Sequence, residues 1–233
     1  MNALMNALER VVEIPVSVDE VIRGDLYIPE NPAGLVIFSH GSGSSRFSSR
    51  NRYVAAVLHE EGFATLLLDL LTFEEERIDL VTAKFRFDIS LLAARLVTAV
   101  DWASANEETA ALRIGLFGAS TGAAAALIAA SRRPAKIAAV VSRGGRPDLA
   151  AMFLGGVRAP TLLLVGGEDG IVIELNREAM LQLKCPKMMQ IIPHASHLFE
   201  EPGALEGVAD AAANWFSELL PHPTNSHRKE VEA

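Results

Sequence analysis

The chain has 233 residues, of which 50% are hydrophobic and 21% are charged, with one cysteine and a formal net charge of -8. A chain of this length can fold around one apolar core without metal or disulfide crosslinks, and a lone Cys185 excludes an intramolecular disulfide. Because 29 acidic side chains outnumber 21 lysines and arginines, we expect no binding to nucleic acid.

Short β-branched runs alternate with longer segments of helical periodicity, which predicts an α/β fold with a mostly parallel twisted sheet of about eight strands. The expected strands are 11–15, 21–28, 35–39, 64–70, 113–118, 137–141, 161–165 and 188–192, and the expected helices are 49–61, 87–105, 121–132 and 203–220. We expect residues 1–220 to form one domain and the polar residues 221–233 to form a disordered tail.

The N-terminus lacks the positive start and the apolar run of a signal peptide, which favours a cytoplasmic protein. The longest uncharged stretch, 114–131, is interrupted by the turn-forming residues 118–122 and therefore does not predict a membrane span. No cluster of histidines and cysteines has metal-ligand spacing, so we expect no metal and no cofactor.

The segment Gly118-Ala119-Ser120-Thr121-Gly122 lies between a predicted strand and a predicted helix. A G-x-S-x-G turn in this place is typical of a nucleophile elbow, which lifts a serine hydroxyl above the end of the sheet. The same residues also fit a simple small-residue turn in front of an alanine-rich helix. We predict that Ser120 is a catalytic nucleophile.

A serine nucleophile needs a histidine base and an acid that orients the base. Asp169 follows the strand predicted at 161–165, and His197 follows the strand predicted at 188–192. The order serine, acid, histidine is that of α/β-hydrolases. We predict Asp169 and His197 as the partners of Ser120, with the neighbours Glu168 and His194 as alternatives.

An oxyanion intermediate needs two backbone N–H donors. The N–H of Thr121, the residue after the nucleophile, is one candidate, and the N–H of Ser42, within the Gly/Ser-rich loop 40–43, is the other. The alternative is that this loop is flexible and has no role in catalysis.

The connection 142–160 is too short for more than one small helix, which predicts little or no cap over the site and favours small or medium acyl groups. Met152 and Phe153 are predicted to edge an acyl pocket, although core packing is the alternative. The acidic segment 72–88 is expected to wall the opposite side as a solvated face.

Several arginines follow predicted strand ends. Arg46 and Arg143 are the candidates for binding a carboxylate or phosphate of the substrate, because guanidinium groups bind such anions in a bidentate way. Arg50, Arg52 and Arg146 lie close to them in the sequence. The alternative is that these arginines pair with local acids such as Asp148.

Together, residues 39–43, 118–122, 166–169 and 194–199 resemble the dienelactone hydrolase-like group of α/β-hydrolases. Residues 142–148 and 199–203 resemble hydrolase domains that are sometimes fused to phosphoribosyltransferases. The resemblance implies a sheet with helices on both faces and a hydrolase activity. True dienelactone hydrolases carry a cysteine nucleophile where this chain has Ser120, and Cys185 lies outside the elbow.

This difference favours hydrolysis of general carboxylic esters through an acyl-enzyme. The alternatives are a lactone, thioester or amide hydrolase on the same triad, or a non-catalytic ligand-binding module. The expected partner is a small-molecule ester, and the expected state is a monomer or a homodimer.

Overall fold

The computed structural model describes residues 7–220, which form one eight-stranded sheet. The strands are β1 (Leu8–Pro15), β2 (Val21–Ile28), β3 (Leu35–Ser39), β4 (Ala64–Leu68), β5 (Ile114–Ala119), β6 (Ile137–Arg143), β7 (Thr161–Gly166) and β8 (Lys187–Ile192). Their spatial order is β1-β2-β4-β3-β5-β6-β7-β8. Strand β2 is antiparallel to both of its neighbours, β1 and β4, and all other neighbouring pairs are parallel. The mostly parallel sheet of eight strands is therefore confirmed.

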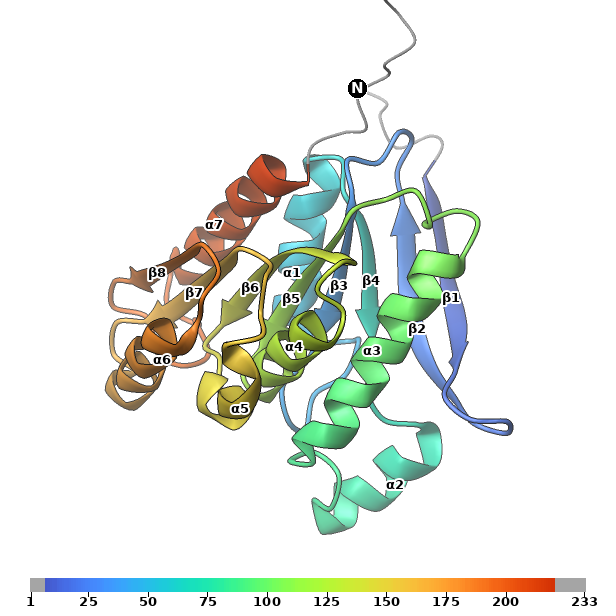
Figure 1. Cartoon of the computed structure of the whole chain (residues 1–233), viewed down its shortest axis with the longest axis horizontal. Helices are drawn as coiled ribbons and strands as arrows, with labels where there is room; N and C mark the ends of the chain where they lie inside the picture. Colours follow the sequence, from blue (N-terminus) through green and yellow to red (C-terminus); the bar gives the residue numbers. More distant parts are fainter. Residues whose placement is uncertain (1–6, 221–233) are drawn as a thin grey trace, which may run out of the picture.

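Helices cover both faces of this sheet (Figure 1). They are α1 (Ser49–Glu60), α2 (Phe73–Thr82), α3 (Ile89–Ala105), α4 (Thr121–Arg132), α5 (Ala151–Leu154), α6 (Gly170–Gln182) and α7 (Ala204–Leu219), with a 3₁₀ helix η1 at Pro147–Ala150. Helices α1 and α7 pack on one face, whereas α3, α4 and α6 lie on the other, in front of the sheet in this view.

The central strands are apolar on both sides because each of their faces meets a helical layer. In β3, Ile37 belongs to the core beneath α3 and α4, whereas its neighbour Phe38 belongs to the core beneath α1 and α7. All five residues of β3 and all six of β5 are buried. A continuous apolar run is the expected sequence of a parallel strand that is covered twice.

Two helices differ from the sequence-based expectation. Helix α2 buries only Asp79, so it shows no apolar periodicity, and it begins at a capping box formed by Thr72 and Glu75. It lies apart from the two helical layers, at the bottom of Figure 1. Helix α6 starts directly after Asp169 and was also not predicted.

The predicted disordered tail, 221–233, lies outside the described residues.

The connection between β6 and β7 contains only η1 and α5, as its length predicts. Within residues 7–220, none of the helices combines the length and the apolar character that crossing a bilayer requires.

The carboxyl ends of the parallel strands all meet at one edge of the sheet. The chain leaves β3 towards α1 on one face and β5 towards α4 on the other, and such a switch point is where open α/β sheets bind ligands.

Candidate active site

The turn between β5 and α4 holds Ser120 in a strained backbone conformation, with φ 52° and ψ -119°. Glycines on either side make the turn possible. A Cβ on Gly118 would lie 2.5 Å from the Cα of Ala123, and a Cβ on Gly122 would lie 2.4 Å from the carbonyl oxygens of both Ser39 and His40. The glycines of the motif are therefore required by close backbone contact, and the turn presents Ser120 at the end of the sheet.

We expect Gly122→Ala to destabilise the fold by about 3 kcal/mol, because the new methyl group would overlap two backbone oxygens that cannot move independently. The comparison is Gly155→Ala. Gly155 has a helical φ of -65°, and a Cβ there would meet no atom within 4 Å. This control is expected to be neutral or slightly stabilising. Urea unfolding measures both, and equal midpoints for the two variants would contradict the packing argument.

Asp169 and His197 are brought together from two different strand ends. The Nδ1 of His197 lies 2.6 Å from Oδ2 of Asp169, which follows β7, while His197 lies in the loop after β8. The side chains of the alternatives, Glu168 and His194, are exposed. Because Nδ1–H donates to the carboxylate, Nε2 of the neutral imidazole is left as a proton acceptor.

Ser120 and His197 line one cavity of about 240 Å³, together with Ser42, Ser44, Arg50 and Arg143. In the described part of the chain, no hydrogen bond joins the Ser120 hydroxyl to the imidazole. Contacts of this kind often form fully only when substrate binds. The cavity therefore holds a hydroxyl and an oriented imidazole in one space.

The loop after β3 approaches the elbow closely. Residues 41–44 form a turn in which the N–H of Ser44 donates to the carbonyl of Gly41 at 3.2 Å, with Gly43 at φ 68°. A Cβ on Gly41 would lie 3.1 Å from the Cβ of Ser120. Ser42 lines the cavity, and Thr121, as the first residue of α4, has an N–H with no intrahelical acceptor. The two predicted oxyanion donors therefore lie on the two segments that meet at Ser120.

His40 fixes this loop, a role that the sequence did not reveal. Its Nε2 accepts the N–H of Leu70 at 3.1 Å, which requires the proton on Nδ1, where it donates to the carbonyl of Gly41 at 2.8 Å. Burial lowers the pKa of His40, despite the opposing effects of the bond to Gly41 and of the Asp69 charge. A neutral imidazole therefore ties the end of β3 to the segment after β4.

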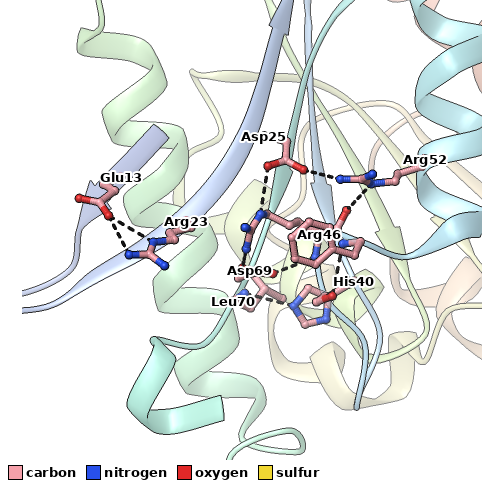
Figure 2. A network of polar contacts seen from close by, with 10 residues as sticks. Glu13, Arg23, Asp25, His40, Arg46, Arg52, Asp69 and Leu70 are labelled. Carbon is pink, nitrogen blue, oxygen red and sulfur yellow. Dashed lines mark hydrogen bonds and ion pairs between the residues drawn. The ribbon is translucent and has the colours of Figure 1, made fainter. Parts of the chain in front are cut away.

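Arg46, predicted to bind substrate, is engaged elsewhere, which corrects that expectation. Its guanidinium pairs with Asp69 and, at 3.0 Å, with Asp25 (Figure 2). Arg52 joins the same network through Asp25 at 2.8 Å. Two carboxylates already satisfy the charge of Arg46, and it lines a different cavity from Ser120.

The other arginines divide into paired and unpaired ones. Arg146 binds Asp148 in a bidentate way at 2.8 Å, as the local alternative predicts. Arg50 pairs with Glu200 at 3.2 Å. Arg143 lines the cavity beside Ser120 and forms no ion pair with any carboxylate of residues 7–220. A charged residue at the end of a buried strand was the signal in the sequence for Arg143.

Met152 and Phe153 do not edge the cavity beside Ser120, so this expectation is also corrected. Met152 is 95% exposed, and Phe153 packs against the core, where Arg132 lies over its ring. Helix α5 is too short to reach over the site.

No group of three or more potential metal-binding side chains occurs between residues 7 and 220.

The model of the family described as "Dienelactone hydrolase family" matches residues 22–220, which include the elbow, both partner loops and the loop after β3. The chain belongs to the dienelactone hydrolase family. The family resemblance and the α/β-hydrolase fold expected from the sequence are thus confirmed, and the assignment makes the protein a member of a hydrolase family.

Solved structures of family members and esterases share this fold. A dienelactone hydrolase from Anabaena variabilis is 57% identical, with a TM-score of 0.90 over 92% of this chain and 99% of that one. Est1E from Butyrivibrio proteoclasticus is 17% identical, with a TM-score of 0.75 over 90% of this chain and 98% of that one, and shows likeness of fold alone.

A putative phosphoribosyl transferase of Mycobacterium tuberculosis is 54% identical over 202 residues, which are 87% of this chain and 45% of that protein. The chain therefore spans about half the length of this curated relative.

Proposed function

We propose that this member of the dienelactone hydrolase family is a serine hydrolase that cleaves small to medium carboxylic esters. The observation that carries the proposal is the pairing of His197 with Asp169 at 2.6 Å, in a cavity that the strained Ser120 also lines. A serine, a histidine and an acid in this arrangement form the machinery of acyl transfer.

In the proposed reaction, Oγ of Ser120 attacks the ester carbonyl while Nε2 of His197 takes the hydroxyl proton. Asp169 keeps the imidazole in the required tautomer and stabilises its charged form. The oxyanion accepts hydrogen bonds from the N–H groups of Ser42 and Thr121. His197 then protonates the leaving alcohol, and a water molecule, activated by the same base, releases the acid from Ser120.

The short connection between β6 and β7 supports small or medium substrates. The connection between β6 and β7 contributes only η1 and α5, and neither Met152 nor Phe153 covers the cavity. The relative that is named a putative phosphoribosyl transferase is matched over only 45% of its length, whereas the family model and the cavity of this chain both favour hydrolysis.

A fluorophosphonate probe tests the proposal directly, because it phosphonylates an activated serine hydroxyl and releases fluoride. We expect one adduct, on the peptide that contains Ser120, and no adduct on heat-denatured protein. Turnover of p-nitrophenyl acetate, butyrate and octanoate then gives the acyl preference, expected to fall with length. Labelling at another residue would reassign the nucleophile, and the absence of both labelling and turnover would favour a binding module.

A further inference from the structure

Arg143 is a buried cation that has no counterion among residues 7–220. Its side chain lies at the carboxyl end of β6, is 8% exposed, and has no hydrogen-bond partner for Nε or Nη1 in the described structure. Its guanidinium carbon lies 5.9 Å from the ring centre of Phe199, at the outer limit of a cation–π contact. Burial, and then the charge of Arg50, lowers its pKa to about 10, so it remains charged at neutral pH. A buried unpaired guanidinium is a strong potential binding group for an anion.

The backbone places Arg143 beside the nucleophile. Arg143 pairs with Ala119 in the register of β5 and β6, and its carbonyl accepts the N–H of Ser120 at 3.1 Å. The cavity that both residues line also contains Arg50 and three further serines. None of the residues lining this cavity within 7–220 is acidic, although the whole chain has a net charge of -8. The cavity is therefore positively charged in an otherwise acidic protein.

The N-terminus of α1 adds a second feature that favours anions. Ser48, the N-cap, and Arg50, in the first turn, both line the cavity. The Ser48 hydroxyl accepts the N–H of Asn51, which leaves the N–H groups of Ser49 and Arg50 without intrahelical acceptors. The first turn of α1 contains no acidic residue, and the helix dipole makes this end partially positive. Such an end is a general site for phosphate groups.

The position of Arg50 supports the same interpretation. A cation in the first turn of a helix is repelled by the partial positive charge of the helix N-terminus. The ion-pair partner of Arg50 is Glu200, whose side chain is 64% exposed. This pair stabilises the charge of Arg50 only slightly, because ion pairs at the surface are weak. An anion in the cavity would balance the positive charges of Arg50 and Arg143, which otherwise repel one another.

We propose that the cavity binds a phosphate group carried by the ester substrate, with Arg143 as the principal ligand and Arg50 and the N-terminus of α1 completing the site. This inference rests on the proposed esterase function and specifies its substrate class. A phosphate dianion fits two guanidinium groups and a helix N-terminus better than a single carboxylate, which one guanidinium already neutralises. The phosphate is not cleaved; it positions the ester carbonyl at Ser120.

The test compares two esters that differ only in the phosphate, 1-acetylglycerol 3-phosphate and 1-acetylglycerol. In the wild type we expect kcat/KM for the phosphate ester to be higher by about tenfold or more, since charge-assisted contacts to phosphate are strong. Arg143→Met is expected to bring the ratio of the two values towards one. The matched control is Arg52→Met, which removes an arginine outside the cavity and should leave the ratio unchanged.

Inorganic phosphate provides a second readout that needs no turnover. The Tm of the wild type should rise with phosphate concentration at constant ionic strength, and that of Arg143→Met should not. If Arg143→Met fails to fold, Arg50→Met takes its place in both measurements and is expected to reduce the ratio and the shift in Tm.

The outcomes separate this inference from the proposed function. Equal hydrolysis of both acetylglycerols by the wild type would overturn the phosphate site and leave the esterase intact. A preference for monoethyl succinate over diethyl succinate, without a preference for the phosphate ester, would likewise overturn it in favour of a carboxylate. A phosphate-dependent Tm that requires Arg143, without hydrolysis of any ester, would support the site and overturn the esterase.

Discussion

Ser120→Ala is expected to lower kcat for p-nitrophenyl esters by about 10³ to 10⁶-fold, because the change removes the hydroxyl proposed to form the acyl-enzyme. The structure gives the reason for expecting so large a loss. Ser120 has φ 52° and lies where the loops carrying Ser42 and His197 meet, so the strained turn presents its hydroxyl, whereas the hydroxyl of the next residue, Thr121, is buried. Steady-state kinetics on the purified variant measures the loss, and fluorophosphonate labelling should disappear with it.

The control for this experiment is Ser217→Ala, which removes an exposed hydroxyl from α7, far along the chain from the cavity. It should retain the activity and labelling of the wild type. Circular dichroism and urea unfolding establish that both variants are folded. A Ser120→Ala protein that retains full esterase activity would exclude Ser120 as the nucleophile, whatever the geometry of its neighbours.

The strands and the elbow were predictable because their sequences are dictated by local contacts. A strand buried on both faces has to be largely apolar, as β3 and β5 are. The glycines at 118 and 122 are required by backbone atoms that approach within 2.5 Å of where a side chain would begin. Local sequence therefore carried enough information to place Ser120 at a strand-to-helix turn.

The partners of the arginines were not predictable, because they depend on which loops the fold brings together. Arg46 pairs with Asp25 and Asp69, from two other segments, and Arg50 pairs with Glu200 from a distant part of the chain. Among the arginines considered for substrate binding, the pair of Arg146 with Asp148, two residues apart, was accessible to local reasoning. Proximity to a strand end in the sequence gave Arg46 and Arg143 equal weight, and tertiary contacts distinguish them.

Helix α2 was missed for a related reason. Helix α2 buries a single residue, Asp79, whose carboxylate accepts the N–H groups of Phe85 and Arg86 and binds the guanidinium of Arg86. A helix held by its caps and by a polar anchor lacks the apolar stripe that reveals an amphipathic helix. Ile78, Leu80 and Val81 are exposed on α2 instead of forming such a stripe.

Asp169→Asn is expected to lower kcat by about 10⁴-fold while KM changes little. The carboxylate accepts Nδ1–H of His197 at 2.6 Å and thereby leaves Nε2 free to take the proton of Ser120. An asparagine amide can donate to Nδ1, which stabilises the tautomer with its proton on Nε2, where it cannot act as a base. It also removes the negative charge that stabilises the imidazolium in the transition state. Measurement of kcat and KM across pH separates this effect from a loss of structure.

The matched control is Glu168→Gln, the same change of acid to amide one residue earlier in the same turn. Glu168 is exposed, and its N–H, which the substitution retains, donates to the carbonyl of Ala195 at 3.0 Å. This variant should therefore keep kcat within about twofold of the wild type, since surface substitutions rarely have larger effects. Equal losses in the two variants would point to a general disturbance of the turn after β7, whereas a loss confined to Glu168→Gln would transfer the role of the acid from Asp169 to Glu168.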